Sequence, residues 1–174
     1  FDSLTSSAIA MIDTDGATDK WDQIFRGIFL FDTSFMGAST TILNSTLYID
    51  GGTNSNSAAW AATISAYQAD PVSNTALENG DYSTIGSTEF ANPIIYSNWT
   101  TSYNHFSMNT NGINAVNTTG ITKYATREAA FDATDTEPTW EANKLTQFGG
   151  VFADTAGTAT DPYLELAWTL DICD

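Results

Sequence analysis

Four carboxylates lie close together near the start of the chain, in the run IDTDGATDKWD. Asp13, Asp15, Asp19 and Asp22 fall within ten residues of sequence. Carboxylate oxygens are the ligands of hard cations such as Ca²⁺, which takes six to eight oxygens in a flexible geometry. The spacing is not that of an EF-hand, because Gly16 comes too early and no glutamate occupies the twelfth position. We therefore predict a structural calcium site here, with a solvated acidic loop as the alternative.

A sugar-binding platform is the second kind of site that the residue types allow. Tyr96, Trp99, Tyr103 and Trp140 lie beside polar segments of the chain. Flat aromatic rings stack on sugar faces, and neighbouring amides and carboxylates bind the hydroxyl groups. Core packing is the alternative, because the interior of a β-sandwich also consumes Trp and Tyr. These four residues are the predicted glycan-binding residues.

Residues suited to catalysis are scarce. The chain has one histidine, His105, and one cysteine, Cys173, so a single chain cannot assemble a zinc site of the usual His/Cys type. His105 lies in YNHFSM, without a GxSxG elbow or another nucleophile motif. Nothing singles out a carboxylate pair for glycoside hydrolysis; Asp132, Asp135 and Glu137 form only a weaker candidate for a cation. We predict that the protein is not an enzyme and needs no cofactor beyond Ca²⁺.

The chain is strongly acidic, with a formal net charge of −16 and only five Lys and Arg residues. Such a surface repels nucleic acid and anionic membranes. No window approaches the roughly 18 apolar residues of a membrane span. We therefore expect no nucleic-acid partner and no membrane insertion. The unpaired Cys173 excludes a disulfide within the chain and leaves a bridge between chains as an alternative to a free thiol.

The elements that must position these residues are mostly strands. Ile28–Phe31 is a continuous apolar run, typical of a strand buried on both faces. In Tyr163–Leu170, alternate residues are apolar, which predicts a strand with one face toward the core. Further strands are expected at 7–12, 43–49, 58–68, 94–99, 103–108, 123–131 and 145–153, an ordered polar loop at 69–92, and one short helix at 112–119. Arg26 is expected to form an ion pair with Asp32 or another acid that braces the fold.

Strands at this spacing, without long helices between them, predict an antiparallel sandwich. At 174 residues the chain is long enough to bury a sizeable core without disulfides. We predict one domain over residues 1–174: an all-β, antiparallel jelly-roll β-sandwich with one short helix.

Three segments carry a resemblance to a known family. RGIFLFDTSFMGASTTILNSTLYI (26–49), the middle segment 73–128 and GGVFADTAGTATDPYLELAW (149–168) are similar to DNRLRE-type, disaggregatase-related jelly-roll modules. The resemblance covers most of residues 24–169 in the same order. The chain departs from the pattern at Phe35-Met36, where Leu-Pro is usual, and its N-terminal strand does not align.

The resemblance implies a carbohydrate-binding-module-like β-sandwich without catalysis of its own, of a kind found in phage and secreted bacterial proteins. We expect a structural or adhesive module at a virion surface, as a decoration or fibre, or in an extracellular assembly. Its partners would be copies of itself or a scaffold or capsid protein, and surface polysaccharide is a further expected ligand. The alternatives are a glycan-binding module proper and a filament subunit that polymerises by donating an exchangeable N-terminal strand, residues 1–12.

Overall fold

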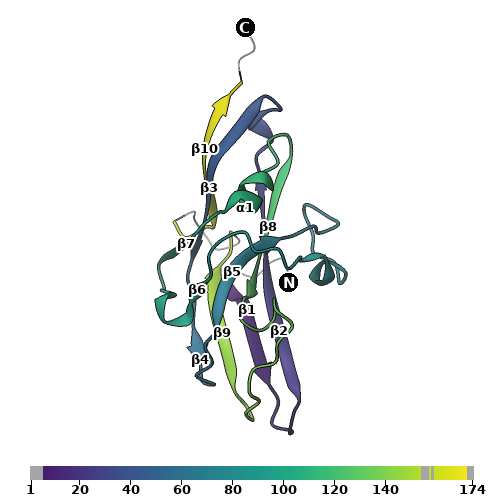
Figure 1. Cartoon of the computed structure of the whole chain (residues 1–174), viewed down its shortest axis with the longest axis vertical. Coiled ribbons are helices and arrows are strands. Elements are labelled where there is room, and N and C mark those ends of the chain that lie inside the picture. Colours follow the sequence, from purple (N-terminus) through teal and green to yellow (C-terminus); the bar gives the residue numbers. More distant parts are fainter. Residues whose placement is uncertain (1–5, 154–156, 158, 172–174) are drawn as a thin grey trace.

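The computed structural model describes residues 6–153, 157 and 159–171, which form an elongated, curled β-sandwich (Figure 1). Within these residues the strands are β1 (Ser6–Thr14), β2 (Trp21–Asp32), β3 (Thr40–Asp50), β4 (Ser55–Asn56), β5 (Thr63–Gln68), β6 (Ile94–Ile95), β7 (Tyr103–Ser107), β8 (Ile121–Glu128), β9 (Leu145–Val151) and β10 (Tyr163–Leu170). One short α-helix, α1 (Thr110–Asn114), and three 3₁₀ turns, Ser34–Met36, Asp81–Thr84 and Tyr96–Asn98, complete the described elements. The prediction of an all-β, antiparallel sandwich with one short helix is confirmed.

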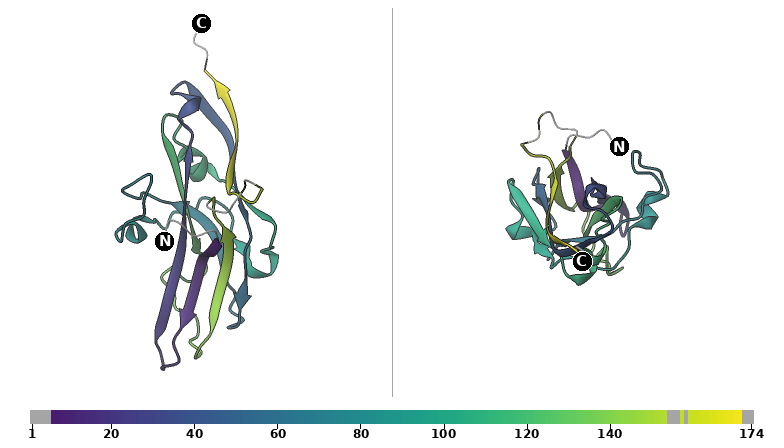
Figure 2. Two further views of the ribbon diagram at one scale, coloured as in Figure 1. Left: turned by 180° about the vertical axis from the view of Figure 1, so that it is seen from behind. Right: turned by 90° about the horizontal axis from the view of Figure 1, so that it is seen from above.

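The strands form two hydrogen-bonded sheets in which every described pairing is antiparallel. The larger sheet has the order β4-β9-β1-β2-β8-β5-β6, and the smaller has the order β10-β3-β7. A bridge between Gly51 and Gly150 links the end of β3 to β9. The larger sheet curls, so that β1 and β9 face β5 and β8 across the core (Figure 2).

Strand β2 belongs to both halves of the larger sheet. Its first half pairs with β1, from Trp21 to Arg26, and its second half pairs with β8, from Gly27 to Asp32. The change of partner strand occurs at Gly27. A Cβ atom at this position would lie 2.6 Å from Oγ1 of Thr126. That hydroxyl donates to the backbone oxygen of Ile9 at 2.7 Å. The missing side chain at Gly27 therefore lets β1, β2 and β8 meet closely.

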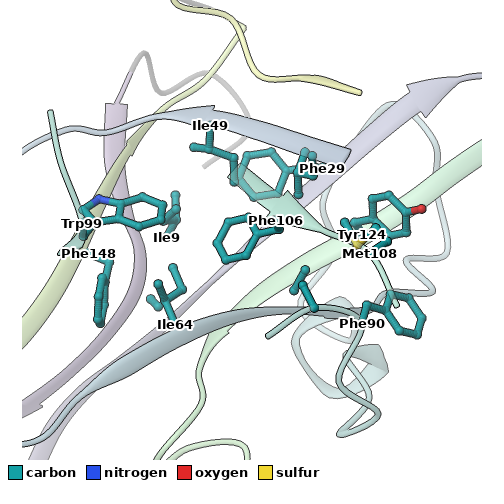
Figure 3. Close-up of a cluster of buried hydrophobic side chains, with 14 of the residues drawn as sticks. Ile9, Phe29, Ile49, Ile64, Phe90, Trp99, Phe106, Met108, Tyr124 and Phe148 are labelled. Atoms are coloured by element: carbon teal, nitrogen blue, oxygen red, sulfur yellow. The ribbon is translucent and has the colours of Figure 1, made fainter. Parts of the chain in front are cut away.

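The core fills the space between the layers (Figure 3). It combines Ile9 and Phe148 of β1 and β9 with Ile64 and Tyr124 of β5 and β8, all fully buried. Trp99 packs edge-on against Phe148, with ring centroids 5.8 Å apart. Residues from seven strands and the loops between them thus meet in one apolar cluster, which holds the curled sheet closed.

Several element boundaries differ from those predicted. The helix begins two residues earlier, because the Asn109 side chain accepts the N–H groups of Asn111 and Gly112 and caps it there. The strand predicted from Ala58 begins only at Thr63. Trp60 is buried ahead of that strand, with its indole N–H donating to the Thr139 oxygen at 3.0 Å. The predicted loop at 69–92 contains one 3₁₀ turn and no strand.

Candidate interaction site

One edge of the second half of β2 has no partner strand among the described residues. Just after β2, the Thr33 N–H donates to the Gly120 oxygen, on the β8 side, at 3.0 Å. Alternate residues of a strand point their backbone groups to opposite edges. The N–H and C=O groups of Ile28 and Leu30 therefore point away from β8. On that side β1 pairs with β2 only as far as Arg26. We call the unpaired side of Gly27–Asp32 the open edge.

The apolar run at the open edge is less buried than predicted. Of Ile28–Phe31, only Phe29 is buried, and the other three side chains are partly exposed. The expectation of a strand covered on both faces is therefore wrong for this chain alone. The physical reason is the early divergence of β1, which leaves this part of β2 without a neighbouring strand on one side among the residues that the structure describes.

Strand β10 is also less covered than its pattern predicts. Leu164 packs against the core. Further along the strand, Trp168 is 42% exposed and Leu170 is exposed as well. The strand pairs with β3 on one side and is an edge strand within the described residues. The apolar face of β10 is therefore packed against the core at its start and exposed to solvent at its end.

A groove of about 500 Å³ runs along the open edge. Its walls are consecutive residues of β2, Phe25–Phe31, together with Ser7 and Ala8 at the start of β1, the loop segment 74–77, Phe152 and Ala153 after β9, and Pro162 before β10. Arg26 is the one charged residue among these described lining residues, and no carboxylate lines the groove. A largely apolar lining without a described carboxylate is unusual in a chain with 21 acidic residues, and it suits a dehydrated contact with a neutral segment.

The charge of Arg26 is held inside the protein by Asp132. Nε and Nη2 of Arg26 donate to the two carboxylate oxygens of Asp132 at 2.9 and 2.6 Å. Arg127 donates to the same two oxygens from its Nε and Nη2 at 3.0 and 3.1 Å. The Asp132 side chain is 4% exposed. Burial alone would raise the pKa of Asp132, but the hydrogen bonds and charges of Arg26 and Arg127 outweigh it and lower that pKa.

The two arginines also fix the polar loop that forms one wall of the groove. Arg26 donates to the Tyr82 oxygen at 3.0 Å and lies 4.0 Å from the centre of that tyrosine ring. Arg127 donates to the Gly86 oxygen at 2.9 Å. Asp81, which is buried, accepts the N–H groups of Glu78 and Val72, and these bonds lower its pKa. The loop is therefore tied to the sheet within its 3₁₀ turn, at Tyr82, and just after it, at Gly86.

Glu128, the last residue of β8, connects to the same group of residues through the backbone of Asp132. It is fully buried, and its carboxylate accepts four backbone N–H groups, those of Thr63, Ala130, Phe131 and Asp132, at 2.6–3.1 Å. Burial raises the pKa of Glu128 despite these four bonds. The carboxylate sets the turn that places Asp132 between the two arginines.

Known proteins provide no further guide to this site. Comparisons of the chain with known protein families, with curated proteins and with solved structures find no match. Among the described residues, no helix is long and apolar enough to cross a membrane.

The predicted calcium ligands lie on and around the first hairpin. Asp13 belongs to β1, Asp22 to β2, and Asp15 and Asp19 to the turn between them. The Asp15 side chain accepts the N–H of Ala17 at 3.3 Å. Within the described part of the chain, no three Asp, Glu, His or Cys side chains come together as a metal would require. The calcium site stays a prediction. The weaker acidic candidate loses Asp132, whose oxygens are occupied by the two arginines.

The predicted glycan-binding residues do not form one surface. Trp99 is buried, and its indole N–H donates to the Gly149 oxygen at 3.0 Å. Tyr96 packs on Phe148 at the core, and Trp140 donates to the Lys20 oxygen at the far end of the molecule. Of the four, Tyr103 lies in an aromatic group on the outer face of the small sheet.

That group, which we call the aromatic face, consists of Tyr48, Tyr103, His105 and Tyr163. The sheet register places Tyr163, Tyr48 and His105 opposite one another on β10, β3 and β7. The rings of Tyr48 and Tyr163 stack with centroids 4.5 Å apart, and Tyr103 meets Tyr163 edge-on at 5.2 Å. The alternating pattern of the three strands places each of these rings on an outer face. Only the pairing of strands that are distant in the sequence shows that the rings are neighbours.

The N-terminal strand is part of the sheet from Ser6 onward. It lies between β9 and β2, and Ile12 pairs with both. Donation of residues 6–12 to a neighbour would therefore require β1 to leave these two partners. Residues 1–5 of the predicted exchangeable strand, and Cys173, lie outside the described residues.

Proposed function

We propose that this protein is a non-catalytic structural or adhesive module that associates with copies of itself in an extracellular assembly or at a virion surface. The observation that carries the proposal is the open edge of β2 beside a groove whose described lining residues include no acid. Unpaired strand edges bind other strands unless a protein blocks them with charges, bulges or prolines. The open edge contains no proline and no register shift, and its one charged residue is Asp32 at its end. The resemblance to jelly-roll modules of phage and secreted proteins supports the same role.

Self-association must overcome the charge of the chain. Two copies with a net charge of −16 each repel one another at low ionic strength. Salt screens this repulsion, because the Debye length falls from about 10 Å at 0.1 M to about 3 Å at 1 M. An association driven by apolar burial and backbone pairing is not weakened by the same salt.

We therefore expect oligomers or fibres to increase as NaCl is raised from 0.1 to 1 M. Light scattering coupled to size exclusion measures the mass, and electron microscopy of the same samples shows whether the assemblies are ordered. A strict monomer at every salt concentration and at high protein concentration would contradict the proposed function.

A second candidate function is glycan binding at the aromatic face. Tyr163 is 40% exposed, at the edge of the small sheet, and Glu165 follows it on the same side of β10. An exposed ring beside hydroxyl and carboxylate groups is a surface on which a sugar can stack and hydrogen-bond.

For this candidate we expect Tyr163→Ala to weaken the affinity for a binding polysaccharide by about tenfold, because one stacking contact is lost. Native gels that contain the polysaccharide measure this affinity from the retardation of the protein. The matched control is Trp168→Ala, which removes a similarly exposed ring, at 42%, from the same strand but outside the aromatic face. Equal losses in both variants, or no binder in a panel of neutral and acidic polysaccharides, would rule out the aromatic face.

A further inference from the structure

We propose that the open edge of β2 is the acceptor site for an extended strand of a second copy of this chain, which lies in the groove and pairs with Ile28 and Leu30. This inference rests on the proposed self-association and names the contact that would produce it. It identifies the surface that accepts the strand and does not assign the segment of the second copy that donates it.

The backbone of the site specifies an extended peptide as its occupant. The open edge offers the N–H and C=O groups of alternate residues in a row, which is the hydrogen-bonding pattern of a strand partner. Six residues, Gly27–Asp32, provide about 20 Å of edge at about 3.3 Å per residue. Backbone groups without a protein or water partner are costly once apolar walls cover them, so a partner that enters this groove must pair with them.

Apolar side chains from several elements line the site. Ala8, Phe152 and Leu77 of the polar loop are all among its lining residues. Pro162, also in the lining, directly precedes β10. The left view of Figure 2 shows that β2 and β10 both continue above the point where β1 begins. A strand added above β1 would extend the sheet that β1 already forms with β2.

The groove is a place where a second copy of this acidic chain meets no carboxylate among the described lining residues. Most faces of one copy repel another because of the 21 acidic residues. The described groove lining holds no carboxylate, and Arg26 is already paired with Asp132. Apolar surface on a strand at the far end of the same chain, at Trp168 and Leu170, is also left uncovered. A contact between two different surfaces of identical subunits is heterologous, and it forms rings or open fibres.

The first test follows backbone amides by residue-resolved hydrogen exchange in the full chain. In the unassembled protein, the Leu30 amide should exchange faster than the Phe29 amide, which points to β8. In the assembly, the Leu30 amide should slow by about tenfold or more, while the Phe29 amide stays protected in both states. A slow Leu30 amide in the monomer would overturn the inference, because the chain's own residues would then fill the site. An assembly in which the Leu30 amide stays fast would overturn it too.

The second test places a charge in the groove without touching the core. Leu77→Asp puts a carboxylate on the groove wall, at a side chain that is 46% exposed. Its matched control, Val72→Asp, adds the same charge to the same loop at a side chain that is 75% exposed and outside the lining. We expect Leu77→Asp to weaken assembly by about tenfold or more relative to Val72→Asp. Equal assembly of the two variants would contradict the acceptor site.

A third pair of variants tests the backbone contact itself. Leu30→Pro removes an N–H that points to the open edge and leaves the β8 ladder in place, and prolines are tolerated at sheet edges. Leu30→Ala trims the same side chain and keeps the N–H. Assembly should be lost in the first and retained in the second, with both checked for folding by circular dichroism. If wild type assembles and Leu30→Pro assembles equally well, this acceptor site is wrong although the proposed self-association holds; a monomeric wild type would instead sink the proposed function.

Discussion

Asp132→Asn is expected to lower the free energy of unfolding by about 3–5 kcal/mol, the cost of removing one partner from a buried ion pair. Asp132 is the shared anion of Arg26 and Arg127, whose guanidinium groups are themselves nearly buried. Asparagine keeps the size of the side chain, but it supplies one oxygen where two are used and turns an N–H₂ group toward N–H donors. Two buried cations would remain without a counter-charge. Urea unfolding followed by tryptophan fluorescence measures the change.

The control for this variant is Asp135→Asn. Asp135 is exposed, three residues further along, and has a positive φ of 53° that asparagine also tolerates. Its substitution should change stability by less than about 0.5 kcal/mol. The acid dependence gives a second readout. Because the pKa of Asp132 is lowered in the folded state, the stability it contributes is present above the ordinary Asp pKa and is lost as the pH falls through the lowered value. Asp132→Asn should remove that part of the acid dependence; an unchanged acid profile would contradict this role.

The sequence was sufficient to predict the class of the fold but not the way the sheet curls. Alternation in Tyr163–Leu170 and the apolar run at Ile28–Phe31 correctly indicated strands. Neither pattern could show that β2 changes partner at Gly27, since this depends on where β1 and β8 approach it. Patterns report which faces prefer burial, and the burial itself depends on the neighbours. At the open edge and on β10, the burial that the sequence pattern predicts exceeds the burial that the fold provides. This excess of exposed apolar surface marks the candidate interaction site.

For the candidate site residues, too, the sequence predicted the kind of interaction but not the partner. Arg26 was expected to pair with an acid, and it does, but the acid is 106 residues away rather than the nearby Asp32. Glu128 and Asp81 carried no local signal, because their partners are backbone N–H groups that only the folded chain brings together. Trp99 was named as a glycan-binding residue with core packing as the alternative, and its burial decides for the core. Tyr103 remains partly exposed because its strand faces solvent on that side.

Glu128→Gln is expected to lower the free energy of unfolding by about 2–5 kcal/mol, although the two side chains have the same shape. Each oxygen of the buried carboxylate accepts two backbone N–H groups. The amide can satisfy one of these pairs with its oxygen, and its N–H₂ group must then face the other two donors at hydrogen-bond distance. Buried donors left without an acceptor cost about 1–3 kcal/mol each, and more when the lost acceptor is charged.

The control is Glu137→Gln, which makes the same change at an exposed glutamate nine residues away and should leave stability within about 0.5 kcal/mol. Two of the four N–H groups belong to Phe131 and Asp132, so Glu128→Gln should also loosen the turn that holds Asp132 between the arginines. The combination of Glu128→Gln with Asp132→Asn should therefore cost less than the sum of the two single losses, because each variant already disturbs the same network. Strict additivity in urea unfolding would show that the buried carboxylate and the arginine pair are energetically separate, and it would contradict a single brace behind the open edge of β2.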